Sequence, residues 1–150
     1  MSVFNKEAFL NSSVTGSNET KVTFVPEGEY TAYVDDLELS SGTKDGRDWY
    51  SCKIKWYIPD ENLKKALGLE HPTVSDSIFL DIENGALAFG VNKNVGLGRI
   101  REALNQNDPK KPWSFSMMKG AGPVRIKVGS RPDKNNPGDV YPTVDRVAKA

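Results

Sequence analysis

Residues 48–58 combine aromatic rings and lysines at a spacing that suits a nucleic-acid-binding strand. The strict alternation of this segment predicts an apolar face made of Tyr50, Cys52, Ile54, Trp56 and Ile58. The opposite face would hold Trp49, Ser51, Lys53, Lys55 and Tyr57. Rings beside cations suit a charged polymer with stackable bases. The simpler alternative for this segment alone is an ordinary solvated face, because aromatics favour strands and lysines keep them soluble.

Other residues with reactive side chains offer little chemistry. Cys52 lies on the predicted core face, where a buried, unreactive thiol is expected. His71 has no second His, Cys or acidic cluster at ligand spacing, so we expect a surface histidine and no metal site. Asp81 and Glu83 would share one side of a strand, but acid–base catalysis also needs a buried, shaped pocket. We therefore expect a protein that is not an enzyme and uses no cofactor.

Glycines at positions 85, 90, 96 and 98 precede or open a helix predicted over residues 94–106. The segment GLGR lacks the third glycine of a dinucleotide fingerprint, and no segment matches a P-loop. We expect tight packing of the helix start, with a phosphate cradle as the weaker alternative.

The charge of the chain is zero overall but unevenly distributed. Residues 1–84 hold 8 Lys/Arg against 15 Asp/Glu, and residues 85–150 hold 12 against 5, which gives −7 and +7. A single cysteine cannot form an internal disulfide, no apolar run reaches transmembrane length, and the N-terminus shows no signal-peptide pattern. These features favour a soluble cytoplasmic protein.

Two regions are expected along the 150 residues: a flexible N-terminal arm over residues 1–24 and one domain over residues 25–150. The arm contains Phe4, Phe9 and Leu10 within polar sequence, and a short helix there is compatible with the pattern. We expect these apolar residues to dock on the domain or on a second subunit, which would make a homo-oligomer; the alternative is a disordered arm.

Five strands are expected in the domain. The first, from residue 26, changes phase at Asp35 and Asp36, which predicts a bulge. The second is the central segment, and the third places Ile78, Leu80 and Ile82 inward and Phe79 outward. After one helical turn near Leu63 and the helix over 94–106, a fourth strand points Arg125 and Lys127 outward. The fifth contains Pro142, which predicts an edge position.

Three strands, a helix and two further strands follow the element order of the OB-fold, an all-β, five-stranded Greek-key barrel with one helix between strands three and four. That fold binds oligonucleotides on strands two and three and on the loops joining strands one to two and four to five. The corresponding loops here contain Lys44 and Arg47, and Arg131 and Lys134, although each loop also holds two aspartates.

The segments VPEGEYTAYVDDLEL, DWYSCKIKWYI, NVGLGRIREALN and MKGAGPVRIKVGSRPD resemble small phage single-stranded-DNA-binding proteins built on one OB-fold. The resemblance spans roughly residues 22–148. It implies non-catalytic binding that protects single strands during phage replication or recombination in the host cytoplasm. It also implies replication or recombination proteins as partners, and a binding set of Trp49, Lys53, Lys55, Tyr57, Phe79, Arg125 and Lys127.

One feature departs from many replicative relatives: the chain ends VDRVAKA, without an acidic, aromatic-tipped tail. Recruitment of partners through such a tail is therefore not expected. The alternative function is an OB-like module that binds another protein through the same aromatic surface.

Overall fold

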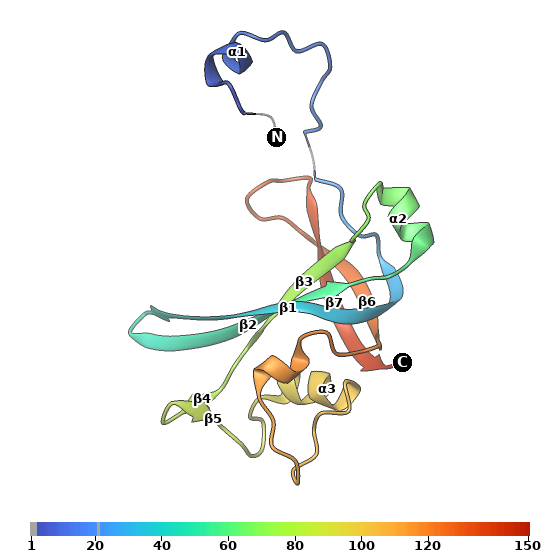
Figure 1. The fold of residues 1–150 in the computed structure, drawn as a ribbon. Coiled ribbons are helices and arrows are strands. Elements are labelled where there is room, and N and C mark those ends of the chain that lie inside the picture. Colours follow the sequence, from blue (N-terminus) through green and yellow to red (C-terminus); the bar gives the residue numbers. More distant parts are fainter. Residues whose placement is uncertain (1–2, 21) are drawn as a thin grey trace.

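Alternating strand sequences build most of this structure, a computed structural model that describes residues 3–20 and 22–150. Five strands form one antiparallel sheet in the order β3-β2-β1-β6-β7 (Figure 1). These strands are β1 (Gly28–Lys44), β2 (Arg47–Tyr57), β3 (Thr73–Phe79), β6 (Val124–Pro132) and β7 (Val140–Lys149). A separate small hairpin joins β4 (Ile82–Glu83) to β5 (Ala86–Leu87). The helical elements are α1 (Lys6–Leu10), α2 (Glu61–Leu67), α3 (Val95–Ala103) and the 3₁₀ helix η1 (Phe115–Met118).

Strand β1 is shared by the two halves of the sheet. Its residues Gly28–Ala32 pair with β6, and its residues Tyr33–Lys44 pair with β2. The register with β2 passes from Val34 directly to Asp36, so the predicted bulge is confirmed and Asp35 has no cross-strand partner. The bulge lets the apolar side continue from Val34 to Leu37, in agreement with the phase change in the sequence.

The two edges of the sheet are β3 and β7, which confirms the edge position expected for the strand with Pro142. No ladder of hydrogen bonds joins these edges within the described chain, so the sheet is open and is not a hydrogen-bonded closed barrel. The edges nevertheless approach each other: Asp76 of β3 and Asp145 of β7 line a common cavity of about 370 Å³.

The core lies on the face of β2 that the alternation predicts. Cys52, Ile54 and Trp56 are each at most 1% exposed, and they belong to the same buried cluster as Val124, Ile126 and Val128 of β6. Because Trp56 is fully enclosed, its replacement by alanine should lower the free energy of unfolding by about 3–5 kcal/mol. Burial raises the pKa of the Cys52 thiol from 9.0 to about 11, which agrees with an unreactive thiol.

Two expectations about the middle of the chain need correction. The third strand ends at Phe79, the last residue paired with β2, so Ile82 belongs to the β4–β5 hairpin. The segment near Leu63 forms a seven-residue helix, α2, where one turn was expected. The Asp60 side chain accepts a hydrogen bond from the Leu63 N–H at 3.1 Å, and Gly68 ends the helix at φ 66°, so both helix ends are capped. The described chain thus contains three α-helices.

The N-terminal arm carries helix α1 apart from the sheet (Figure 1). The Asn5 side chain caps this helix by accepting a hydrogen bond from the Ala8 N–H at 3.1 Å. Phe4 and Phe9 contact each other, and both stay exposed, so docking of these rings on their own sheet is not seen. Val25 is the first buried residue along the described chain, and residues 1, 2 and 21 of the arm lie outside the described residues. None of the described helices is long and apolar enough to cross a membrane.

Candidate nucleic-acid interface

A groove of about 710 Å³ lies where the β1–β2 turn meets the end of β3. It brings together four of the residues predicted from the sequence: Lys44, Arg47, Trp49 and Phe79. Lys44 and Arg47 lie opposite each other on β1 and β2, next to the Asp45-Gly46 turn. Phe79 of β3 lies opposite Ser51 of β2. We call this feature the hairpin groove.

The two aromatic rings of the hairpin groove differ in how much of each is covered by neighbouring residues. Phe79 is 79% exposed, whereas Trp49 is 37% exposed because its indole lies across the backbone of Gly42 on β1. A Cβ at Gly42 would come within 2.6 Å of the indole Cζ2, so only glycine permits this close approach. Both rings therefore offer a free π-face, one held by the neighbouring strand and one standing clear of the sheet.

Small hydroxyl side chains line the groove between the rings. Ser51 of β2 and Ser77 of β3 both contribute to the hairpin groove, and neither was named as a site residue from the sequence. Their signal was present, because the strand alternation places each on the same face as the nearest aromatic residue. A serine hydroxyl can donate or accept a hydrogen bond, which suits the polar edge of a nucleobase.

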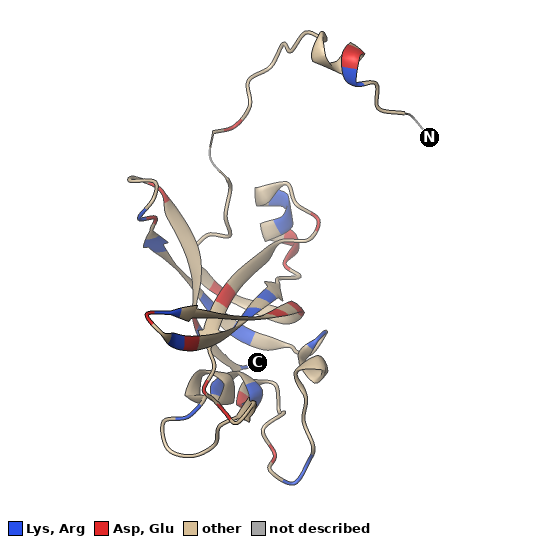
Figure 2. Cartoon of the chain, turned by 90° about the vertical axis from the view of Figure 1, so that its left-hand side faces the viewer, with Lys and Arg blue, Asp and Glu red and all other residues tan. Residues whose placement is uncertain are grey.

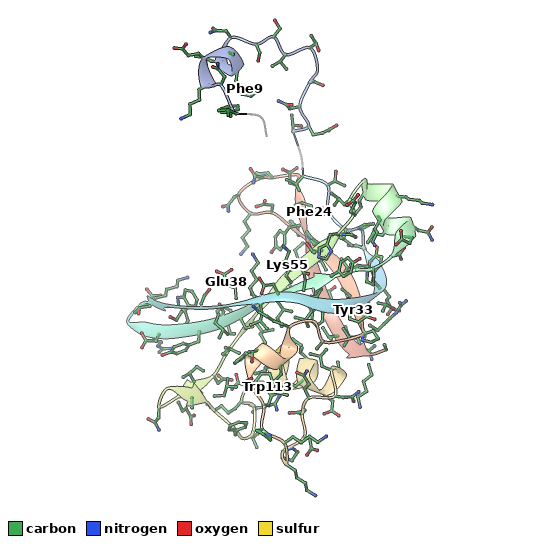
Figure 3. All side chains as sticks on the ribbon, viewed as in Figure 1. Phe9, Phe24, Tyr33, Glu38, Lys55 and Trp113 are labelled. Carbon is green, nitrogen blue, oxygen red and sulfur yellow. The ribbon has the colours of Figure 1, made fainter. Side chains whose placement is uncertain are left out.

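The lysines in the middle of β2 face acidic residues on β1. Lys53 is the cross-strand partner of Glu38, and Lys55 is the partner of Asp36. Glu38 and Lys55 lie on the same side of these strands, opposite Trp113 (Figure 3). The Leu37 N–H donates to Asp36 and Lys119 lies 3.3 Å away, and together they lower the pKa of the Asp36 carboxyl. Acidic and basic residues are interspersed along the sheet (Figure 2), so its outer face is not a uniformly cationic surface.

Tyr57 is less accessible than its outward position suggests. Its ring is stacked with His71 at a centroid distance of 4.0 Å and an interplanar angle of 10°. His71 Nε2 lies 2.9 Å from Asp35 Oδ1, so the bulge residue holds the histidine against the tyrosine. Lys64 of α2 lies 5.5 Å from the Tyr57 ring centroid. One face of Tyr57 is thus already occupied. From the sequence His71 was expected to be only a surface histidine, and its stacking on Tyr57 was not predicted.

The β6–β7 loop reaches the same region through Arg131. Besides the hairpin groove and the 370 Å³ cavity between the sheet edges, a further cavity of about 540 Å³ lies here. It is lined by Ser77, Arg131 and Tyr141 together with Asp76 and Asp145. Ser77 lines both this cavity and the hairpin groove, so the two are adjacent. Burial raises the pKa of Asp76 despite the opposing effect of Arg131. Lys134 lies exposed in the same loop and lines neither cavity.

Arg125 and Lys127 occupy a different part of the surface. They point outward from β6, next to Thr31 and Glu29 of β1, and the stretch of β1 that pairs with β6 does not pair with β2. Arg125 Nη1 donates a hydrogen bond to Thr31 Oγ1 at 3.3 Å. The structure therefore does not bring these two cations to the hairpin groove.

The start of α3 is occupied by protein groups. The Asn94 N–H donates to Asp81 Oδ2 and the Asp81 N–H donates to Asn94 Oδ1, each at 2.8 Å. The carboxylate of Asp81 takes the place that a phosphate would need. Tight packing does not explain the helix glycines either, because a Cβ at Gly96 would meet Ile78 at an ordinary 3.7 Å and one at Gly98 would meet nothing.

Arg101 and Trp113 form another pair of a cation and an aromatic ring, and both contact other residues of the protein. Arg101 lies 4.2 Å from the Trp113 ring centroid, and both residues hydrogen-bond to Gln106. No cluster of His, Cys, Asp and Glu able to hold a metal ion occurs among residues 3–20 and 22–150.

Comparison with known proteins adds no relative: no protein-family model matches this chain, and no curated protein matches it significantly.

Proposed function

We propose that this chain binds single-stranded DNA, without catalysing a reaction, through the hairpin groove and the outer faces of β2 and β3. The strand order supports this. Strand β1 lies between β2 and β6, α3 follows β3 and precedes β6 along the chain, and the sheet edges at β3 and β7 are open. This order is the one expected for a partly open OB-fold barrel, which supports the proposal. In that fold the surface used for oligonucleotides consists of the second and third strands with the first and fourth loops, which here are the β1–β2 turn and the β6–β7 loop.

The observation that carries the proposal is the pairing of two exposed rings with two cations in one groove. Bases stack on aromatic side chains with a contribution of about 1–3 kcal/mol each, and every base offers a π-face. Trp49 and Phe79 supply such faces, while Lys44 and Arg47 form no ion pair with any described residue and remain available to phosphates. A duplex hides its base faces, so this groove favours single strands.

Stacking should contribute more than charge. Lys53 and Lys55 face Glu38 and Asp36, and the β1–β2 turn carries Asp45 and Asp48 beside its own cations. The cations of the hairpin groove and the adjacent cavity are Lys44, Arg47 and Arg131, and Arg131 shares its cavity with Asp76 and Asp145. If each of these cations contacts one phosphate, the logarithm of affinity should fall with the logarithm of salt concentration with a slope of about −2, since single strands contribute about −0.7 per contact.

In this proposal the biological role is protection of single strands during phage replication or recombination, in the cytoplasm of the host, with replication or recombination proteins nearby. The role rests on the sequence resemblance. Binding needs no cofactor, because rings, hydroxyls and cations suffice for it.

The proposal is tested by titrating a labelled homopolymer strand and its duplex at about 50 and about 200 mM salt. We expect clear preference for the strand and a shallow salt dependence. Binding should also quench tryptophan fluorescence mainly through Trp49, because Trp56 is buried and Trp113 is covered by Arg101. Equal affinity for strand and duplex, or no binding, would support the alternative of a protein-interaction module.

A further inference from the structure

Helix α1 presents an apolar surface that no described residue of its own chain covers. Phe4 and Phe9 are 64% and 67% exposed, their ring centroids are 5.0 Å apart, and Leu10 beside them is 81% exposed. The Asn5 cap holds the turn that keeps the two rings together. No residue from 3 to 20 is buried. Such a patch gains most from burial against an existing apolar surface.

An apolar groove of about 670 Å³ lies between α3 and the end of β7, and we call it the α3 groove. Its apolar lining includes Leu87, Ala88, Phe89, Val95, Leu97 and Val147. Phe89 is 81% exposed at its border, so the lining extends onto the surface. The charged residues around it are Lys93, Arg99, Arg101, Glu102 and Lys149, a net of +3. The arm over residues 1–24 carries Lys6 and Lys21 against Glu7 and Glu19, a net of zero, so its charge does not oppose docking at this cationic border.

The arm and the α3 groove lie at opposite ends of the molecule (Figure 1). In this arrangement the arm of one copy meets the groove of the next copy more directly than its own. A contact between two different surfaces is heterologous, and when it does not close into a ring it extends into an open row of subunits, as copies bound along one strand require. We propose that the arm of one copy docks Phe4 and Phe9 into the α3 groove of the neighbouring copy on the same DNA strand. This inference rests on the proposed function.

The size of the contact explains why it would operate on DNA. Two phenylalanine rings bury roughly 300–500 Å² of their own surface at most. Stable interfaces bury about 1,200–2,000 Å² in total, so this contact alone should hold free copies together only weakly. Two copies on one strand are at a high effective concentration, and weak docking then becomes favourable. The consequence is cooperative binding to long strands and ordinary binding to short ones.

An equilibrium experiment separates docking from DNA binding. We would compare a strand of about 12 nucleotides, which holds one copy, with one of about 60, which holds several. The Phe4→Ala/Phe9→Ala variant and the Phe89→Ala variant should each lose about tenfold or more in affinity for the long strand and keep the short-strand affinity. Val14→Ala, which removes another exposed apolar side chain of the arm, is the matched control and should change neither. Unchanged long-strand affinity in both test variants overturns the proposal.

A cross-linking experiment identifies the occupant of the groove. Full-length protein with Phe9→Cys is mixed with full-length protein carrying Phe89→Cys in air-saturated buffer, where dissolved oxygen takes up the two electrons and two protons released when a disulfide forms. The native Cys52 is buried and stays unreactive. A disulfide between the two copies on the long strand, and at high protein concentration without DNA, is the expected result. No adduct in either condition overturns the proposal, as does a disulfide within single chains that carry both substitutions. If the short strand is not bound, only the proposed function is refuted. The cross-linking measurement without DNA then still decides whether the N-terminal arm docks in the α3 groove.

Discussion

Replacing Phe79 by alanine should separate DNA binding from folding. The ring is 79% exposed, so only about a fifth of it is covered by the rest of the chain. A fully buried phenylalanine hides about 200 Å², so the covered part is about 40 Å² and its loss should cost at most about 1 kcal/mol. For a domain of this size that change lowers the melting temperature by about 2–4 °C.

The binding loss should be larger than the stability loss. A base stacked on Phe79 contributes about 1–3 kcal/mol, so the Kd for a short strand should rise roughly 5- to 150-fold in the Phe79→Ala variant. Fluorescence anisotropy of a labelled strand of about 12 nucleotides measures this Kd. Calorimetry on the same samples gives the melting temperature.

Phe89 provides a matched control for Phe79. It is the same residue type and is 81% exposed, but it lines the α3 groove and not the hairpin groove. Phe89→Ala should cost the same small amount of stability and leave the short-strand Kd unchanged. If the two variants lose short-strand affinity equally, or if Phe79→Ala loses none, the assignment of the hairpin groove as the binding surface is refuted.

Three further predictions concern charge and protonation. Arg47→Gln should weaken short-strand binding and reduce the slope of log affinity against log salt by about 0.7, whereas Lys127→Gln on β6 should change the slope less; titrations at several salt concentrations measure both. Asp76→Asn should raise the melting temperature at pH 7 but not at about pH 3, because the pKa of Asp76 is raised on folding, so its ionised form destabilises the fold once pH exceeds that pKa. An equal gain at both pH values would contradict this. Burial raises the pKa of Cys52 from 9.0 to about 11, so the free energy of unfolding should fall between these pH values by up to about 1.4 kcal/mol per pH unit. Denaturant titrations of wild type and Cys52→Ala should show this extra slope only in wild type.

The strand faces could be predicted because alternation alone sets them. Cys52, Ile54 and Trp56 lie in the core and Lys53 and Lys55 lie outside, as the period-two pattern requires. The bulge was also visible, since apolar residues change phase at Asp35 and Asp36 and only an extra residue restores the register. Helix α3 was found within a few residues of its ends, from its apolar spacing.

Contacts between distant residues were beyond the sequence pattern. The stack of His71 on Tyr57 depends on Asp35, which is 36 positions away, and no local periodicity encodes it. Similarly, Lys53 and Lys55 look free in the sequence, but their partners Glu38 and Asp36 are set by the register of the β1–β2 pairing. The edge at which β3 stops could not be predicted either, because Ile82 continues the alternation past the last residue that β2 can pair.

The β1–β2 hairpin extends beyond the sheet (Figure 1). The register of β2 with β3 ends at the pair Ser51 and Phe79, and the Leu80 N–H donates one further hydrogen bond to the Tyr50 carbonyl at 2.8 Å. Within the described chain, residues 47–49 pair with β1 alone. A two-stranded ribbon is only marginally stable in water. Backbone amides near the tip should therefore exchange with solvent faster than those of the core strands, because they open without global unfolding. The indole of Trp49, which lies across Gly42, then holds the two strands together near the tip, where the hairpin opens most easily. A base that stacks on that indole would slow the opening of the ribbon. Binding of single-stranded DNA should therefore slow hydrogen exchange of the backbone amides at the hairpin tip.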